Sequence, residues 1–189
     1  FDPTVDFGNF VDVYLNVPRF FSWRIPRGNA GVEYGIAGGP DIDIIGEFEK
    51  LIDFQGVQIE NKCSGMIPIG PPVNVSTKRG FLIGDAAGQT KPFTGGGIVY
   101  GLIASECAAN VVNPDRTETV GMYEQDWRKR IGREIEVGKW IRKGYSLPQT
   151  VQSMGLRFFS GEIGVHMDRP TSLFSREQFE VMKSSRKVK

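Results

Sequence analysis

One segment of this 189-residue chain constrains its folding more than any other: an apolar run, an acidic residue and a glycine-rich loop in succession. The run covers residues 80–84, the acid is Asp85, and three consecutive glycines at 95–97 precede a second apolar stretch. A short apolar run bounded by glycine is typical of a buried strand. Residues 97–112, where Glu106 is the only formal charge, favour a helix that is buried on most sides. The pattern therefore predicts strand, loop and helix in that order.

The loop between these elements suits a polar ligand that is bound by backbone groups. Asp85 follows the expected strand directly and can accept hydrogen bonds from ligand hydroxyls. Glycines at 95–97 allow backbone N–H groups at a helix N-terminus to approach a ligand closely, and the helix dipole there favours negative charge. A tight turn that feeds a close-packed helix explains the same residues. The residues alone leave both interpretations open.

Two common glycine-rich sites do not fit. A Walker loop needs a glycine immediately before the lysine, and Lys91 has none. The dinucleotide-binding GxGxxG pattern is broken because Tyr100 stands where its last glycine belongs.

The first part of the chain has the alternation of a β-sheet. Apolar residues alternate with others in three runs between residues 11 and 36, and a turn-rich connector separates the last two runs. The pattern predicts an antiparallel sheet with an aromatic-rich face, to which a short strand at 57–60 is added. The alternating residues are Val11, Val13, Leu15 and Val17, then Phe21, Trp23 and Ile25, then Val32, Tyr34 and Ile36.

Helical spacing follows. We expect Asp41 to cap a helix that carries Ile42, Ile45, Phe48, Leu51 and Ile52. A long helix is predicted over 118–143, because four large apolar residues recur at every fourth position and two ion pairs are spaced for a helix. The apolar residues are Tyr123, Trp127, Ile131 and Ile135, and the pairs are Glu124 with Arg128 and Asp126 with Arg130. The fold class is thus α/β (α+β), with a helical C-terminal region.

Charge and composition exclude several classes of protein. The net charge of +1 argues against a general nucleic-acid binder, and 40% hydrophobic residues argue against disorder. Residues 1–114 hold 8 basic and 12 acidic residues, whereas residues 115–189 hold 15 and 10. The basic end, residues 183–189, fits either a solvated tail or peripheral contact with an anionic membrane or an acidic partner.

The cysteines suggest a reducing compartment. Cys63 and Cys107 form no CxxC pair, and with His166 as the one histidine they cannot build a usual zinc site, so no metal is expected. No signal peptide or spanning apolar run is visible, which predicts a cytoplasmic protein. The chain begins at Phe1 rather than Met, and we expect it to be a piece of a longer protein.

The segment from Gly84 to Ile98 resembles the second flavin motif of the glutathione-reductase-type FAD superfamily, in its p-hydroxybenzoate-hydroxylase-like branch. In that motif Gly-Asp-Ala-Ala is followed by proline and then by glycines that open a helix. The resemblance implies that Asp85 binds the ribityl hydroxyls of FAD and that the backbone around Gly96 faces the flavin pyrimidine edge. The cofactor-binding residues that it implies are Gly84, Asp85, Ala86, Pro92, Gly95, Gly96, Gly97 and Ile98.

A second segment narrows the resemblance. Residues 21–26, Phe-Ser-Trp-Arg-Ile-Pro, resemble the aromatic-x-Trp-x-aliphatic-Pro motif of geranylgeranyl reductases, and residues 63–68 stand where that family has a Gly-x-x-Pro loop. The substrate-binding residues implied are Phe21, Trp23, Pro26 and Tyr34. An aromatic face lines an isoprenoid channel or packs a core equally well, so both roles stay open for Trp23. Cys63 is either a proton donor or an inert loop thiol.

The family resemblance implies a domain order and an activity. It divides the chain into a partial substrate-binding sheet domain at 1–78, the second half of an FAD-binding domain at 79–114 and a helical region at 115–189. The family's first unit, a strand–GxGxxG–helix that binds the ADP half of FAD, is not in these residues. The implied activity is FAD-dependent saturation of isoprenoid double bonds in lipid or chlorophyll side chains, with reduced nicotinamide or ferredoxin as the electron donor. The alternatives are an aromatic hydroxylase or halogenase of the same superfamily, or a non-catalytic piece that needs a separate nucleotide-binding chain.

Overall fold

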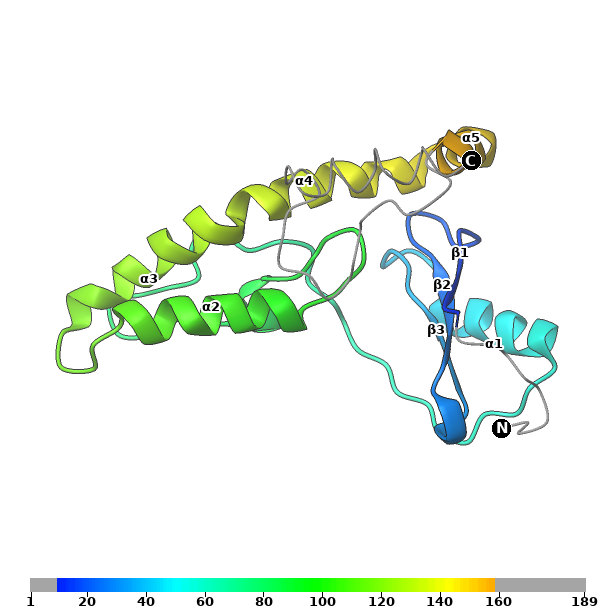
Figure 1. The fold of residues 1–189 in the computed structure, drawn as a ribbon, viewed down its shortest axis with the longest axis horizontal. Helices are drawn as coiled ribbons and strands as arrows, with labels where there is room; N and C mark the ends of the chain where they lie inside the picture. The colour runs from blue at the N-terminus through cyan, green and yellow to red at the C-terminus, as the bar shows by residue number, and fades with distance from the viewer. Residues whose placement is uncertain (1–9, 159–189) are drawn as a thin grey trace, which may run out of the picture. The chain divides into compact units, whose positions relative to one another are not determined.

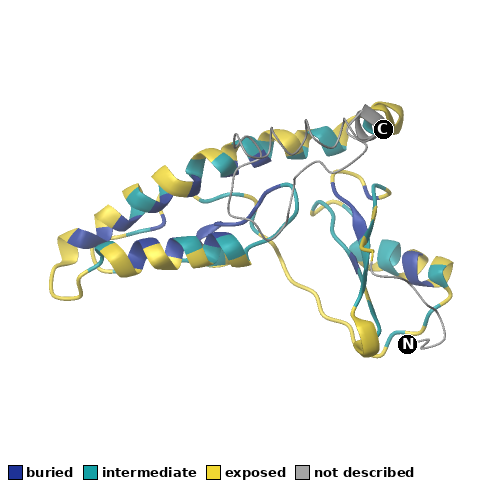
Figure 2. Cartoon of the chain, in the orientation of Figure 1, coloured by how far each residue is buried: buried dark blue, intermediate teal, exposed yellow. Residues whose placement is uncertain are grey.

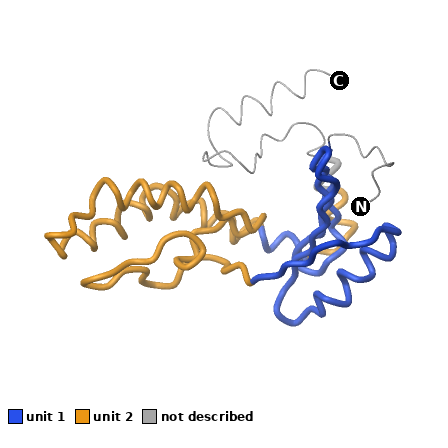
Figure 3. The backbone as a smooth tube through the Cα atoms, turned by 90° about the horizontal axis from the view of Figure 1, so that it is seen from below, with its two compact units in different colours: residues 1–65, 142–146 blue, residues 66–141, 147–189 orange. Residues whose placement is uncertain are grey.

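The computed structural model describes residues 10–158, which form two compact units (Figure 3). The first unit contains residues up to 65 together with 142–146, and the second contains residues 66–141 together with those from 147 on. His166 and the basic segment 183–189 lie outside the described residues. No helix in the described part of the chain is both long enough and apolar enough to cross a membrane.

The first unit is built on a three-stranded antiparallel sheet (Figure 1). Its strands are β1 Asp12–Tyr14, β2 Ser22–Pro26 and β3 Val32–Ile36, in the order β1-β2-β3, with the short 3-10 helix η1 Gly28–Ala30 between the last two. The predicted antiparallel sheet is confirmed. Trp23 lies opposite Gly35 in the register, and its indole ring occupies the space that a side chain at Gly35 would need.

Helix α1, Ile44–Gln55, follows the sheet and begins two residues later than predicted. Its N-cap is Asp43, whose carboxylate accepts a hydrogen bond from the backbone N–H of Gly46 at 3.1 Å. The prediction that Asp41 caps this helix is wrong, because Asp41 forms an ion pair with Arg19. The helix ends at Gly56, which adopts a left-handed conformation with φ of 64°.

Two predicted strands are absent from the described part of the chain. Residues 57–60 have no strand pairing, although their composition favours one. Residues 80–84 form a single bridge, from Phe81 to Ser76, and Leu82 is 46% exposed. A short apolar run becomes a buried strand only where neighbouring strands cover it, and the described residues of the second unit supply none.

The second unit is mainly helical. It contains the 3-10 helix η2 Gly84–Ala87, helix α2 Ile98–Val111, the 3-10 helix η3 Thr117–Thr119, helix α3 Val120–Trp127, the π-helical turn η4 Arg128–Gly132, and helix α4 Arg133–Arg142. Helix α5, Gln149–Phe158, also belongs to it, whereas the 3-10 helix η5, Lys143–Ser146, is counted with the first unit. The helices predicted over 97–112 and 118–143 are confirmed, the second with a π turn inside it.

The core of the second unit lies between α2 and the long helical stretch that follows it (Figure 2). The residues spaced by four, Tyr123, Trp127, Ile131 and Ile135, are at most 1% exposed. They pack with the small residues of α2, which allows the helices to approach closely. Helix α2 is less buried than predicted, because Ile98 and Leu102 on one of its faces are 81% and 66% exposed.

The two predicted ion pairs had different outcomes. Glu124 and Arg128 form the expected i,i+4 pair, with 2.7 Å between Oε1 and Nη2. Arg130 instead reaches Glu106 on α2, at 2.7 Å between Nη1 and Oε2. The second pair therefore joins two helices instead of two turns of one helix.

Candidate functional site

The acidic residue of the motif, Asp85, lies against the first turn of α2. Residues 84–87 form the turn η2, which Gly88 ends in a left-handed conformation with φ of 63°. A Cβ atom at Gly97, the N-cap of α2, would meet Oδ1 of Asp85. The missing side chain of Gly97 is thus what leaves room for the exposed Asp85 carboxylate, and the structure brings together the two residues that the motif predicts at one site.

The glycine loop closes on itself before α2 begins. The N–H of Lys91 donates to the carbonyl of Gly96 at 2.9 Å, and the N–H of Gly95 donates back to the carbonyl of Lys91 at 2.8 Å. Gly95 has a φ of 77°, which other residues adopt only with strain. No described side chain caps α2 at Gly97, so the donors of its first turn are open to a ligand or to water.

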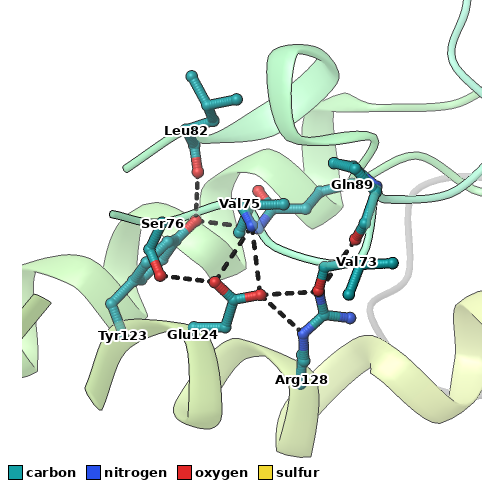
Figure 4. Close-up of polar contacts among 9 residues, drawn as sticks. Val73, Val75, Ser76, Leu82, Gln89, Tyr123, Glu124 and Arg128 are labelled. Atoms are coloured by element: carbon teal, nitrogen blue, oxygen red, sulfur yellow. Dashed lines mark hydrogen bonds and ion pairs between the residues drawn. The ribbon is translucent and has the colours of Figure 1, made fainter. Parts of the chain in front are cut away.

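A buried glutamine holds the turn in shape (Figure 4). The amide oxygen of Gln89 accepts from the N–H of Gly84 at 2.7 Å, and its NH₂ group donates to the hydroxyl of Tyr123 at 2.9 Å. Tyr123 in turn donates to the carbonyl of Leu82 at 2.8 Å. This chain of hydrogen bonds connects α3 to both ends of the segment that carries Asp85. Local spacing does not predict this chain of hydrogen bonds, because nothing in it relates residue 89 to residue 123.

A second polar junction connects α3 to residues 72–76 (Figure 4). The carboxylate of Glu124 accepts from the Ser76 hydroxyl at 2.6 Å and from the Val75 N–H at 3.1 Å. Arg128 pairs with the same carboxylate and also donates to the carbonyl of Val73 at 2.8 Å. Burial alone would raise the pKa of Glu124, but the hydrogen bonds from Ser76, Arg128 and Val75 lower it below its ordinary value.

The remaining cofactor candidates divide into exposed and buried residues. Ala86, which follows Asp85, and Ile98, which follows Gly97, are both exposed. Pro92 is buried, and its Cδ lies 2.7 Å from the place where a Cβ at Gly138 of α4 would stand. Pro92 thus anchors the loop on α4 by packing, with glycine required at position 138 for the close approach.

The substrate candidates belong to the first unit (Figure 3). Phe21 is buried and stacks on Phe20 with 4.5 Å between ring centroids, and it meets Trp23 edge-on at 5.8 Å. Trp23 and Pro26 are half-buried. Tyr34 is also half-buried; its hydroxyl has no hydrogen-bond partner among the described residues, and burial raises its pKa. Phe21 therefore contributes to a core, while the other three present partly accessible surface.

The two cysteines differ in their surroundings. Cys63 is exposed in the connection that follows α1, whereas Cys107 is buried in the core of the second unit and burial raises its pKa. Within residues 10–158 no three His, Cys, Asp or Glu side chains are placed to hold a metal ion together.

Comparisons with known proteins identify relatives of the chain. No family model matches it. An uncharacterised protein of Methanocaldococcus jannaschii is 28% identical over 87% of the chain, and digeranylgeranylglycerophospholipid reductase 1 of Methanococcoides burtonii is 33% identical over 62% of it. The chain covers 48% and 32% of these two proteins, so it spans about half or less of the length of such relatives.

A solved structure supports the fold. The crystal structure of a geranylgeranyl bacteriochlorophyll reductase-like protein from Thermoplasma acidophilum matches 92% of the chain with a TM-score of 0.70, at 18% identity, and the match covers 47% of that protein. Another similar protein, digeranylgeranylglycerophospholipid reductase 2 of Methanothermobacter thermautotrophicus, is 30% identical over 67% of the chain and is covered to 36%. Over the aligned part of its length, the chain is therefore a relative of the digeranylgeranylglycerophospholipid reductases, and it shares the fold of a geranylgeranyl reductase-like protein.

Proposed function

We propose that this chain is the part of an FAD-dependent reductase that binds the ribityl and ring half of the cofactor and takes part in saturating isoprenoid double bonds of a lipid. The observation that carries the proposal is the contact of the Asp85 carboxylate with Gly97 at the uncapped start of α2. The names of the relatives, digeranylgeranylglycerophospholipid reductases, favour this reaction over hydroxylation or halogenation.

The residues present fit the flavin half of FAD. The exposed carboxylate of Asp85 can accept hydrogen bonds from ribityl hydroxyls. Beside it, Gly96 and Gly97 expose backbone at the positive end of the α2 dipole, which would stabilise negative charge at the pyrimidine edge. Gln89 holds the Asp85 turn in place through its hydrogen bond with the Gly84 N–H. When bound, the reduced cofactor would supply the hydride for an alkene, and the protein would supply orientation and an apolar surrounding.

The substrate side of the proposal rests on the first unit. Trp23, Pro26 and Tyr34 would contact the isoprenoid chain, and Phe21 would support them from the core. Cys63, as the exposed thiol, remains our candidate for the proton donor. Reduced nicotinamide or ferredoxin would supply the electrons. The protein would be cytoplasmic and in peripheral contact with the membrane that holds the lipid.

Replacing Asp85 tests the cofactor site. Asp85→Ala should weaken FAD binding about 10- to 100-fold, because a hydrogen bond to a charged group contributes roughly 1.5–3 kcal/mol. Asp53→Ala removes another exposed carboxylate, on α1, and should leave binding unchanged. Binding is followed by the NMR shifts of the amides of residues 95–97 during titration. Equal affinities of the two variants would refute the role of Asp85.

The affinity of these 189 residues alone is a second test. The pyrophosphate contacts of FAD would come from a nucleotide-binding unit that these residues do not contain, so we expect a dissociation constant weaker than roughly 100 μM. Sub-micromolar binding would show that the site makes its affinity in another way.

The NMR resonance of the Trp23 indole N–H tests whether this residue contacts the lipid substrate. Titration with a geranylgeranyl glyceryl ether in detergent micelles should shift the indole N–H resonance of Trp23 and leave that of Trp127 unchanged, because Trp127 is fully buried. The detergent alone is the control. A Trp23 resonance that does not respond to the lipid would remove it from the proposed channel.

A further inference from the structure

Lys91 is a buried, charged residue of the glycine loop, and it has no role in the flavin site as described above. It is 5% exposed, and lysine is rarely buried to this extent. Its backbone closes the loop in both directions, since its N–H donates to Gly96 and its carbonyl accepts from Gly95. The position of its Cα is therefore set by the same hydrogen bonds that shape the loop.

The side chain of Lys91 extends beneath the loop toward α2 and α4. Its Cδ lies 4.0 Å from the place where a Cβ at Gly96 would stand, and its Nζ lies 5.6 Å from the ring centroid of Tyr100 in the first turn of α2. A cation at this distance from an aromatic ring is attracted to it. The hydroxyl of Tyr100 donates to Oε2 of Glu134 on α4 at 3.0 Å.

Three titratable side chains from three segments thus face one another: Lys91 from the loop, Tyr100 from α2 and Glu134 from α4. Burial raises the pKa of Glu134, while the Tyr100 hydrogen bond and the positive charge of Lys91 act to lower it. Burial and the charge of Glu134 raise the pKa of Tyr100. The cluster therefore places the positive charge of Lys91 near the Tyr100 ring and its counter-charge, Glu134, on α4.

A buried ammonium group is costly to desolvate, and an apolar side chain would fill the same volume without that cost. The electrostatic field of the buried Lys91 ammonium, unlike that of a surface lysine, is weakly screened by solvent. A negative charge that develops at the glycine loop would therefore be stabilised by Lys91 in addition to the helix dipole.

Resting on the proposed flavin site, we propose that Lys91 is a positioning residue that sets the positive potential at the glycine loop, so that the loop binds anionic reduced flavin more tightly than neutral oxidised flavin. Glu134 is the counter-charge that moderates this preference. Lys91 acts through the electrostatic field of its ammonium group and not by touching the flavin, because its side chain is buried.

The test measures the ratio of the dissociation constants for oxidised and reduced FMN, from the NMR shifts of the amides of residues 95–97. FMN keeps the same phosphate in both states, so the ratio isolates the charge of the ring. Lys91→Met keeps the length of the side chain and should lower the ratio roughly 10-fold, as expected for the loss of one weakly screened charge beside the loop. Lys91→Arg should preserve the ratio, and Glu134→Gln should raise it.

A second readout needs no flavin. In the unliganded chain, Lys91→Met should raise the pKa of the Glu134 carboxyl measured by ¹³C NMR, because the charge that lowers it is gone. A Glu134 titration that is identical with and without the charge at position 91 would overturn the proposed coupling.

The outcomes separate this inference from the proposed function. If Lys91→Met weakens both forms of FMN by the same factor, the residue only shapes the loop and the inference is wrong, while the flavin site stands. If Asp85→Ala leaves the affinity for both forms of FMN unchanged, the flavin site itself is wrong, and the inference fails with it.

Discussion

Replacing Glu124 with glutamine should destabilise the second unit, because this carboxylate joins α3 to residues 72–76. The side chain of Glu124 is 15% exposed and accepts hydrogen bonds from Ser76, Val75 and Arg128. Glutamine keeps the shape and one carbonyl oxygen. Its NH₂ group, however, must face at least one of these three donors, and the charge that strengthens every bond of the junction is lost.

The size of the effect follows from the same contacts. Hydrogen bonds to a charged group contribute roughly 1.5–3 kcal/mol, and breaking a buried ion pair costs about 3–5 kcal/mol. Because the Arg128 side chain is 35% exposed and can be solvated, we expect a loss of about 2–3 kcal/mol in the free energy of unfolding. For a chain of this length that corresponds to a fall of roughly 4–12 °C in melting temperature.

Glu118→Gln is the matched control. Glu118 pairs with Arg116, but both side chains are about two-thirds exposed, so the melting temperature should not change measurably. Thermal and urea unfolding followed by circular dichroism compare the two variants. Equal changes in stability for Glu124→Gln and Glu118→Gln would refute the claim that the junction stabilises the unit.

The difference in stability between the parent chain and Glu124→Gln should also depend on pH, in a direction that the pKa of Glu124 determines. The pKa of Glu124 in the folded chain lies below its ordinary value of 4.5. Its stabilising contribution is therefore complete above pH 4.5 and disappears as the pH falls through the lower folded value. The stability gap between the parent and Glu124→Gln should shrink on acidification, and a gap that widens would contradict this explanation.

Two further substitutions test the loop. Gly97→Ala would place a methyl group against the Asp85 carboxylate, so the flavin affinity measured by NMR should fall, and an unchanged affinity would argue against this site. The control is Gly121→Ala on α3, whose methyl group meets nothing within 4 Å and should stabilise the chain by roughly 0.5–1 kcal/mol. Gln89→Leu removes the acceptor of the Gly84 N–H and the donor to the Tyr123 hydroxyl, and should cost about 1–3 kcal/mol in urea unfolding. A stability within 0.5 kcal/mol of the parent, roughly the scatter for surface substitutions, would show that these hydrogen bonds are dispensable.

Local pattern was sufficient to predict the elements whose partners are close in sequence. The sheet followed from period-2 alternation around Trp23, and the long helix followed from the spacing of Tyr123, Trp127 and Ile131. The approach of Asp85 to Gly97 was also predictable, because the motif places an acid before a glycine-opened helix. In each case the information lies within about fifteen residues.

The failures have a common cause. Whether residues 80–84 become a strand depends on neighbouring strands, which a local apolar run does not reveal. Asp41 and Asp43 are equally good caps by composition, and Arg19 decides between them by pairing with Asp41. The junctions at Gln89 and Glu124 were missed for the same reason, since their partners lie 34 and 49 residues away.

Those two junctions also order the folding of the chain in time. Helices α2 and α3 follow one another closely and can pair as soon as both exist, but residues 75–89 acquire their hydrogen bonds to α3 only after a loop of 34 to 49 residues has closed. During synthesis, residues 75–89 would leave the ribosome well before the helix that shapes them. We therefore expect pulse-labelled hydrogen exchange to show the amides of α2 protected before that of Val75, which donates to Glu124 of α3, and simultaneous protection would contradict this order.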